Sequence, residues 1–248
     1  MHRCALTVFI VGFIPAVALG QAEAEARALV EKSIKAHGGA DKLDRLRNVR
    51  LKLTGTIKAN GVEAQFTGEL ATKLPDRSKL TLELDVNNVK ILVVNVHQKA
   101  KAWARIAEQV EELSAERLLE QQMRSHQMHV ANLVPLIKGK DHRLSPLGEI
   151  KVEGRPAVGV RVETKGRQDI SLYFDKENAL LVKMERRGLD LMQKDVAVEV
   201  FYSAYKEFDG VKQPTKRVTH HDGNVYTVVE LTELRVDDQI ADSEFERP

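Results

Sequence analysis

The sequence predicts an α+β fold, an antiparallel sheet of about eleven strands with roughly two or three helices covering it. Two observations predict this class. Apolar and polar residues alternate with a period of two through most of the chain, as in strands with one buried face. Pairs of residues typical of tight hairpin turns separate these runs, including Asn60-Gly61, Asn87-Asn88, Asp209-Gly210 and Asp222-Gly223.

Composition indicates one globular domain without a nucleic-acid partner. The chain has 248 residues, of which 43% are hydrophobic and 30% charged, so it can bury a core. Its net charge of +2 is spread along the sequence, whereas nucleic-acid binding requires a concentrated basic face.

Residues 1–20 are typical of a secretory signal peptide. Arg3 precedes an apolar run over residues 5–17, and Ala18 and Gly20 are the small residues that a signal peptidase requires before Gln21. The apolar run is shorter than the roughly 20 residues of a membrane-spanning helix. We therefore expect cleavage and a mature domain over residues 21–248 in the periplasm or outside the cell.

Cysteine usage limits the chemistry of that mature chain. The only cysteine, Cys4, lies in the predicted signal peptide and ahead of its apolar core. The mature protein would then have no disulfide, no cysteine nucleophile and no thiolate ligand for a metal.

The first element is an amphipathic helix over residues 22–36, with apolar residues such as Val30 and Ile34 at helical spacing. Gly38 and Gly39 end it. Alternating strands then follow from Val49 to the short strand that contains Trp103.

A helical insert near residues 106–147 interrupts the strands. Ser114 is a suitable cap for a helix that Pro135 ends or kinks. Strands resume after it, and the clearest has Val196, Val198, Val200, Tyr202 and Ala204 on one face. Pro214 in the following strand predicts an interruption or a position near a sheet edge.

The predicted sheet is wider than its helical cover. About eleven strands at ~4.8 Å spacing span ~50 Å, whereas the helices cover about 30 Å, at about 10–12 Å for each. A sheet of this width curls or splits. The residues leave two shapes open, a curled sheet with an apolar cavity and a sandwich filled by side chains.

Several segments resemble a known superfamily. These are an opening helix ending in HGG, KVEGRPAVGVRV, LYFDKENALLVK, VFYSAYKEFDGVKQPTK and a terminal SEFERP. Together they resemble the LolA/LolB-like periplasmic lipoprotein carriers and outer-membrane lipoprotein-sorting proteins. The resemblance implies a half-open barrel of about eleven strands whose concave, apolar face receives acyl chains beneath helices. The insert is larger than in the carriers, and the sequence lacks the lipid-attachment cysteine of the receptor subtype.

Bulky apolar residues are the candidates for lining such a cavity, or else for an ordinary core. We expect the cavity lining at Leu80, Leu82, Leu84, Val93, Trp103, Leu118, Met123 and Leu133.

The sequence contains no motif of a known catalytic or metal site. The GxSxG, P-loop and HExxH patterns are missing from the sequence. His126 and His129 are three residues apart in the predicted helix, but no carboxylate in a suitable position completes a metal site. We therefore expect no cofactor, no metal and no enzymatic activity.

The expected function is a periplasmic or secreted carrier of lipid or lipoprotein acyl chains. Its partners would be those acyl chains and an envelope protein that receives them, and we expect a monomer. The alternative is a non-catalytic sensory or protein-binding module of the same fold with a filled cavity.

Overall fold

One antiparallel sheet of thirteen strands dominates the computed structural model, which describes residues 16–59 and 61–248. The strand order is β6-β5-β4-β3-β2-β1-β13-β12-β11-β10-β9-β8-β7. Almost all neighbours are consecutive in sequence, and the first and last strands of this order do not pair, so the sheet stays open. The predicted fold class is confirmed, with thirteen strands in place of about eleven.

The strands on the β6 side of the sheet, from edge to centre, are β6 (Gln109–Glu112), β5 (Lys101–Ile106), β4 (Val89–Gln98), β3 (Arg77–Val86), β2 (Val62–Lys73) and β1 (Asn48–Ala59). The others continue to the opposite edge as β13 (Asn224–Val236), β12 (Val211–His221), β11 (Asp195–Phe208), β10 (Leu181–Leu189), β9 (Ile170–Asp175), β8 (Arg155–Thr164) and β7 (His142–Val152). The helices are α1 (Ala16–Ala36), α2 (Ala40–Arg45), α3 (Ala115–Ala131), α4 (Val134–Lys138) and the 3₁₀ helix η1 (Asp242–Phe245).

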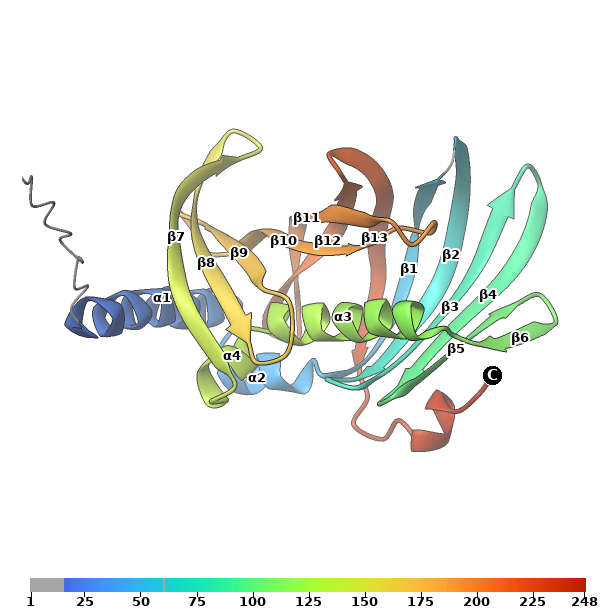
Figure 1. The fold of residues 1–248 in the computed structure, drawn as a ribbon, viewed down its shortest axis with the longest axis horizontal. Helices are drawn as coiled ribbons and strands as arrows, with labels where there is room; N and C mark the ends of the chain where they lie inside the picture. Colours follow the sequence, from blue (N-terminus) through green and yellow to red (C-terminus); the bar gives the residue numbers. More distant parts are fainter. Residues whose placement is uncertain (1–15, 60) are drawn as a thin grey trace, which may run out of the picture.

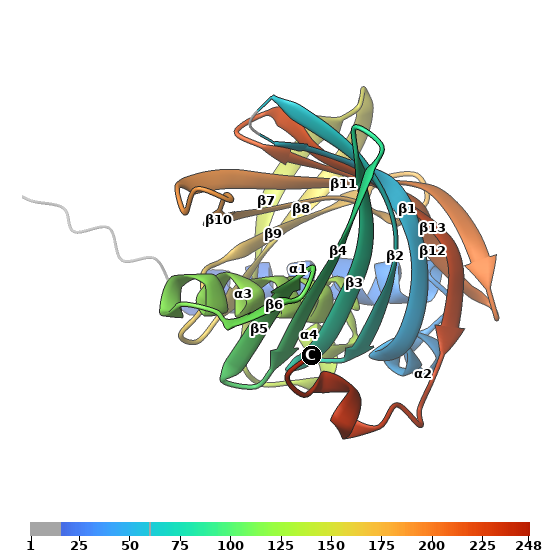
Figure 2. The same cartoon turned by 90° about the vertical axis from the view of Figure 1, so that its right-hand side faces the viewer.

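The sheet curls around α3. Figure 1 shows α3 extending from the β5–β6 edge toward β10 across the concave face, and Figure 2 shows the strands arching over it. Helix α1 contacts β7 and α4 near the β7 edge and packs on the same concave face, and η1 contacts β3 and β4. The concave face is therefore covered unevenly, by α1 and α4 at one side and by α3 in the middle.

The hairpin residues adopt the backbone conformation that the sequence predicts. Asn87 and Asn88 have φ values of 53° and 63°, and Asp209 and Gly210 have 49° and 77°. Positive φ at both central residues is the signature of a type I′ turn, whose twist matches that of the flanking strands.

Buried residues form clusters on both faces of the sheet. The largest cluster joins α1 and α4 to β8–β11 and includes Val30, Leu136 and Phe174. A second cluster, on β1–β3 and β13, includes Leu53 and Leu231. The C-terminal segment buries a third, at Trp103, Ile240 and Phe245. Fewer helices lie over β1–β3 than over β7–β10, and this difference positions the candidate site.

The boundaries differ from the sequence predictions in three places. Helix α1 begins at Ala16, before the predicted residue 22, and residues 1–15 of the predicted signal peptide lie outside the described residues. The insert at residues 106–147 contains β6, α3 and α4, but its last residues already belong to β7. Helix α3 ends before Leu133, whose φ is 68°, and Pro135 lies in the first turn of α4.

The strand that contains Pro214 is not near an edge. β12 lies in the middle of the sheet, paired with β11 and β13. The irregularity is in β11 instead, where Ala204 has a φ of 53° and is exposed, so it leaves the face that Tyr202 shares with Val200. Thr215 donates a hydrogen bond to the Ala204 carbonyl at 2.5 Å. The register of β11 and β12 is the same on both sides of Ala204, and β12 pairs with β13 only from Lys216 onward. Pro214 therefore lies in a part of the strand that is paired on one side alone, where a residue without an N–H is tolerated.

Candidate functional site

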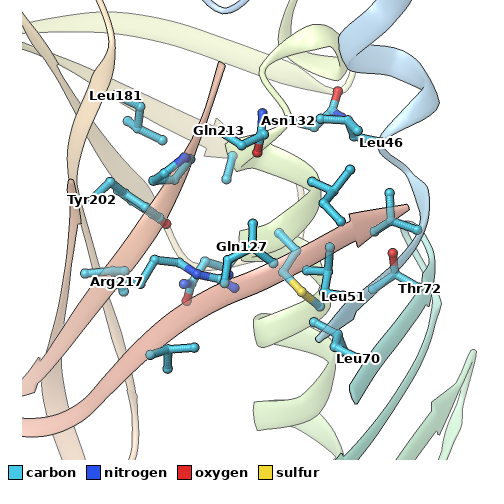
Figure 3. Close-up of a pocket in the computed structure, with 18 of the residues that line it drawn as sticks. Leu46, Leu51, Leu70, Thr72, Gln127, Asn132, Leu181, Tyr202, Gln213 and Arg217 are labelled. Carbon is cyan, nitrogen blue, oxygen red and sulfur yellow. The ribbon is translucent and has the colours of Figure 1, made fainter. Parts of the chain in front are cut away.

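A cavity of about 290 Å³ lies between the concave face of the sheet and helices α2 and α3. Figure 3 shows Leu51 and Leu70 on one wall, Tyr202 and Arg217 on the opposite wall, and Gln127 of α3 between them. Most of the lining is aliphatic and comes from the central strands, at Leu51, Leu53, Leu70, Leu80, Val229, Leu231 and Leu234.

The strand register brings these leucines together. Leu51 of β1 is opposite Leu70 of β2 and Leu234 of β13, and Leu70 is opposite Leu80 of β3. Directly opposed residues of antiparallel strands point to the same face and lie about 4.5–5.5 Å apart at Cβ. The result is a continuous leucine surface across four strands.

Helix α3 covers the cavity because its sequence specifies both its start and its inner face. The Ser114 hydroxyl accepts a hydrogen bond from the Arg117 N–H and caps the first turn, as predicted. Met128 and Ala131, three residues apart on α3, line the side of the cavity opposite the sheet.

Two polar contacts tie α3 to opposite sides of the curled sheet. His97 Nδ1 of β4 lies 2.9 Å from the Ser125 hydroxyl. On β10, the Arg186 guanidinium donates to both Glu120 carboxylate oxygens, at 2.7 and 3.3 Å, and the side chains of the pair are only 4% and 10% exposed. Helix α3 therefore bridges the opening of the sheet.

The Glu120–Arg186 pair is embedded in further hydrogen bonds. Glu120 also accepts from the Leu189 N–H at 3.1 Å and from Arg124 at 3.0 Å. Burial raises the pKa of Glu120, but Arg186, Arg124 and the Leu189 N–H together outweigh that effect, and the pKa lies below its ordinary value. Arg186 Nε donates to Gln127 at 2.7 Å, and this connects the pair to the cavity wall.

The cavity contains a few polar groups among its aliphatic walls. The Tyr205 hydroxyl donates to the Leu181 carbonyl at 2.5 Å, and burial raises the pKa of the phenol far above its ordinary value. His37 Nδ1 is 2.8 Å from the Ser33 carbonyl, and burial lowers the pKa of the imidazole. A neutral His37 that donates through Nδ1 is consistent with both observations.

Three histidines cluster where α3 meets β7. The ring centroid of His142 lies 6.1 Å from that of His126 and 6.4 Å from that of His129. Burial lowers the pKa of His126 to about 3 and that of His129 to about 4, and the other histidines and Arg167 act in the same direction. Within residues 16–59 and 61–248, no three His, Asp, Glu or Cys side chains are grouped as ligands for a metal.

Of the eight residues predicted to line the cavity, Leu80 is the one on its wall. Leu82 and Leu84 pack beside it in the same leucine cluster, and Val93 is opposite Leu82 on the neighbouring strand. These residues extend the concave surface without reaching the cavity.

The other four lie elsewhere. Trp103 is opposite Val96 and packs against Ile240 and Phe245 on the convex face, so its assignment to the cavity is wrong. Alternation does not reveal which of the two faces of β5 lines the cavity, and the C-terminal segment buries the convex face of β4 and β5.

The helical candidates face neighbouring regions. Leu118 packs against Ala102 and Ala104, and Leu133 is buried in the cluster beneath α1 and α4. Met123 lines a second, wider cleft of about 700 Å³ between α3 and the turns of both sides of the sheet. That cleft has charged walls, including Glu120 and Arg167, and therefore suits an acyl chain less well than the leucine-lined cavity.

Sequence reasoning missed most of the cavity lining. Alternation places Leu51 and Leu53 on one face of a strand, and Val229 and Leu231 on one face of another. These strands are β1 and β13, which pair with each other although more than half of the chain separates them in sequence. No local signal in the sequence contains that pairing.

No protein-family model matches the sequence, and no curated protein matches it either. Solved structures do match this chain. A LolA superfamily protein from Nitrosomonas europaea matches with a TM-score of 0.57 and 13% identity, over 90% of this chain and 97% of that one. The chain has a LolA-like fold.

Two further crystal structures agree with that assignment. A proposed outer membrane lipoprotein-sorting protein domain from Vibrio parahaemolyticus has a TM-score of 0.55 and 11% identity, over 90% of this chain and 97% of that one. A DUF1329 family protein from Desulfovibrio piger has a TM-score of 0.54 and 17% identity, over 89% and 97%. At these identities the LolA-like fold is what the likeness establishes. Among the described helices, none combines the length and the apolar character needed to cross a membrane.

Proposed function

We propose that this protein is an exported, non-catalytic carrier that binds the acyl chains of lipids or lipoproteins in the cavity beneath α3. One observation carries the proposal. The curled sheet leaves an unfilled space of about 290 Å³ whose walls are mainly leucine and valine side chains.

The physical basis is the transfer of methylene groups from water to these walls. Each buried methylene contributes about 0.8 kcal/mol. The cavity volume corresponds to roughly ten groups of ~30 Å³, which is the share of one water molecule in the liquid. A chain of that length gains about 8 kcal/mol before the cost of association is subtracted. Binding of this strength is reversible, as a carrier requires.

The LolA-like fold also supports the proposal. Two of the similar structures carry the names of a LolA superfamily protein and a proposed lipoprotein-sorting domain. The predicted signal peptide at residues 1–20 would place the protein in the periplasm or outside the cell, where such cargo occurs.

The test compares two neighbouring residues of β13 that point to opposite faces. Val229 lines the cavity, whereas Val228 lies on the same strand and does not. We expect the protein to bind a neutral fluorescent probe, N-phenyl-1-naphthylamine, and to carry lipid that native mass spectrometry detects. Val229→Phe should weaken uptake by filling the cavity, and Val228→Phe should not.

Well-folded protein without bound lipid and without probe uptake would contradict the proposal. Equal uptake by the two phenylalanine variants would place any binding outside this cavity.

A further inference from the structure

One cationic side chain projects into the otherwise uncharged cavity. Arg217 lies on β12, directly opposite Tyr202 of β11, and both side chains line the same wall (Figure 3). No aspartate or glutamate is among the described residues that line the cavity. The wall therefore has a positive charge without a negative counterpart.

The surroundings of Arg217 differ from those of the other arginine on this face. Arg186 is paired with Glu120 at 2.7 Å. Burial lowers the pKa of the Arg217 guanidinium, and the one group that acts in the opposite direction is the Tyr202 phenol, not a carboxylate. Correspondingly, burial raises the pKa of Tyr202 while the charge of Arg217 acts against that rise, so the two groups are neighbours.

An unpaired guanidinium in an apolar wall is costly to the folded protein. Arginine stays protonated under all ordinary conditions, so it cannot relieve the cost by losing its proton. An anion that enters the cavity would meet donors already in place. The planar guanidinium matches a carboxylate, with two parallel N–H donors for two oxygens.

The volume restricts what else that anion carries. About 290 Å³ is near the lower limit of ligand pockets, which range from roughly 300 to 1,000 Å³. It accommodates a single chain of roughly ten methylene-sized groups, at ~30 Å³ for each. A space near this lower limit favours one acyl chain over two or three side by side.

We infer that the cavity takes a single-chain fatty acid, with its carboxylate on Arg217 and its hydrocarbon chain against the leucines of β1–β3. The Tyr202 hydroxyl lies beside the guanidinium and donates only weakly, to Met184 Sδ at 3.9 Å, so it is able to turn and donate to the carboxylate. This inference rests on the proposed function, because it names the ligand class of the same cavity.

The experiment compares ligands that differ in the head group alone. Decanoic acid and decanol are titrated against the full protein at pH 7.5, with displacement of N-phenyl-1-naphthylamine as the readout. A charge-assisted hydrogen bond sheltered from water predicts at least about tenfold tighter binding of the acid. The same titrations are repeated on Arg217→Met, on Arg217→Lys and on the control Arg161→Met, whose side chain is exposed on β8.

We expect the Arg217→Met variant to bind the acid and the alcohol equally, because the substitution weakens binding of the acid and leaves binding of the alcohol unchanged. Arg217→Lys should retain part of the preference, because it keeps the charge without the planar fork. Arg161→Met should resemble the wild type.

The outcomes separate the inference from the proposed function. If decanol binds as tightly as decanoate in the wild type, or if Arg217→Met keeps the preference, the fatty-acid inference is overturned while acyl-chain binding stands. A diacyl phosphatidylglycerol that binds more tightly than decanoate also overturns the single-chain assignment. If the wild type binds neither ligand nor the neutral probe, the proposed function fails as well.

Discussion

Replacing Glu120 by glutamine tests whether α3 is held over the cavity by its buried ion pair. The substitution keeps the shape of the side chain and removes its charge. Arg186 then retains hydrogen bonds to Gln127 at 2.7 Å and to the Arg187 carbonyl at 2.8 Å. No other carboxylate among the described residues forms an ion pair with it.

The magnitude follows from this arrangement. Removing one partner of a buried ion pair costs about 3–5 kcal/mol because an uncompensated charge remains. The two remaining hydrogen bonds of Arg186 favour the lower end, about 3 kcal/mol. Arg186→Met should cost less than Glu120→Gln, because Glu120 would still be paired with Arg124 at 3.0 Å.

Urea unfolding followed by the fluorescence of Trp103 measures the free energy of unfolding. Trp103 is the only tryptophan of the chain and packs on the convex face, away from α3, so it reports unfolding of the sheet and not local movement of the helix. Hydrogen exchange of the α3 amides measures opening of the helix separately. The double variant Glu120→Gln/Arg186→Met should cost less than the sum of the single variants, because the unpaired guanidinium is removed.

Two results would refute this reasoning. A cost below about 1 kcal/mol for Glu120→Gln would be typical of an exposed ion pair and not of a buried one. Additive costs in the double variant would show that the two side chains do not act as a pair.

Two further predictions follow from the structure. The low pKa values of His126 (about 3) and His129 (about 4) mean that the unfolded chain binds protons first as the pH falls below 6.5. The contribution of these histidines to stability should therefore be complete above pH 6.5 and fall toward pH 4, by up to about 1.4 kcal/mol per pH unit for each histidine. Urea unfolding at pH 7.5 and at pH 5.5 measures this fall. A His126→Asn/His129→Asn variant whose stability has the same pH dependence as the wild type would contradict the assignment. Gly38→Ala should destabilise the protein by more than about 2 kcal/mol beyond Gly39→Ala. Both glycines have positive φ, 119° and 98°, but only at Gly38 would a Cβ overlap another group, the Gly210 carbonyl oxygen; equal thermal-unfolding midpoints for the two variants would rule out this contact.

Local signals in the sequence determined most of the strands, the hairpin turns and the start of α3. Asn87-Asn88 and Asp209-Gly210 form the turns that their residue types predict, since these residues tolerate positive φ. Ser114 caps α3 for an equally local reason, as its hydroxyl reaches the N–H three residues ahead. The resemblance of short segments to LolA-like proteins correctly indicated the fold.

The tertiary structure decided which apolar faces are filled and which enclose a cavity. Alternation states that one face of a strand is buried, but not what covers it. Trp103 shows the difference, because Ile240 and Phe245, far away in the sequence, bury it on the convex face. The same is true of Leu51, which reaches the cavity only because β1 pairs with β13.

The charge of Arg217 is a property of the sequence, but its isolation is not. An arginine in a strand is ordinarily paired or solvated, and the residues around it in sequence do not reveal which. Only the curl of the sheet, with α3 across its opening, places Arg217 in a wall that contains no carboxylate. Contacts between residues far apart along the chain determine the cavity and its single charge, and local sequence patterns do not encode such contacts.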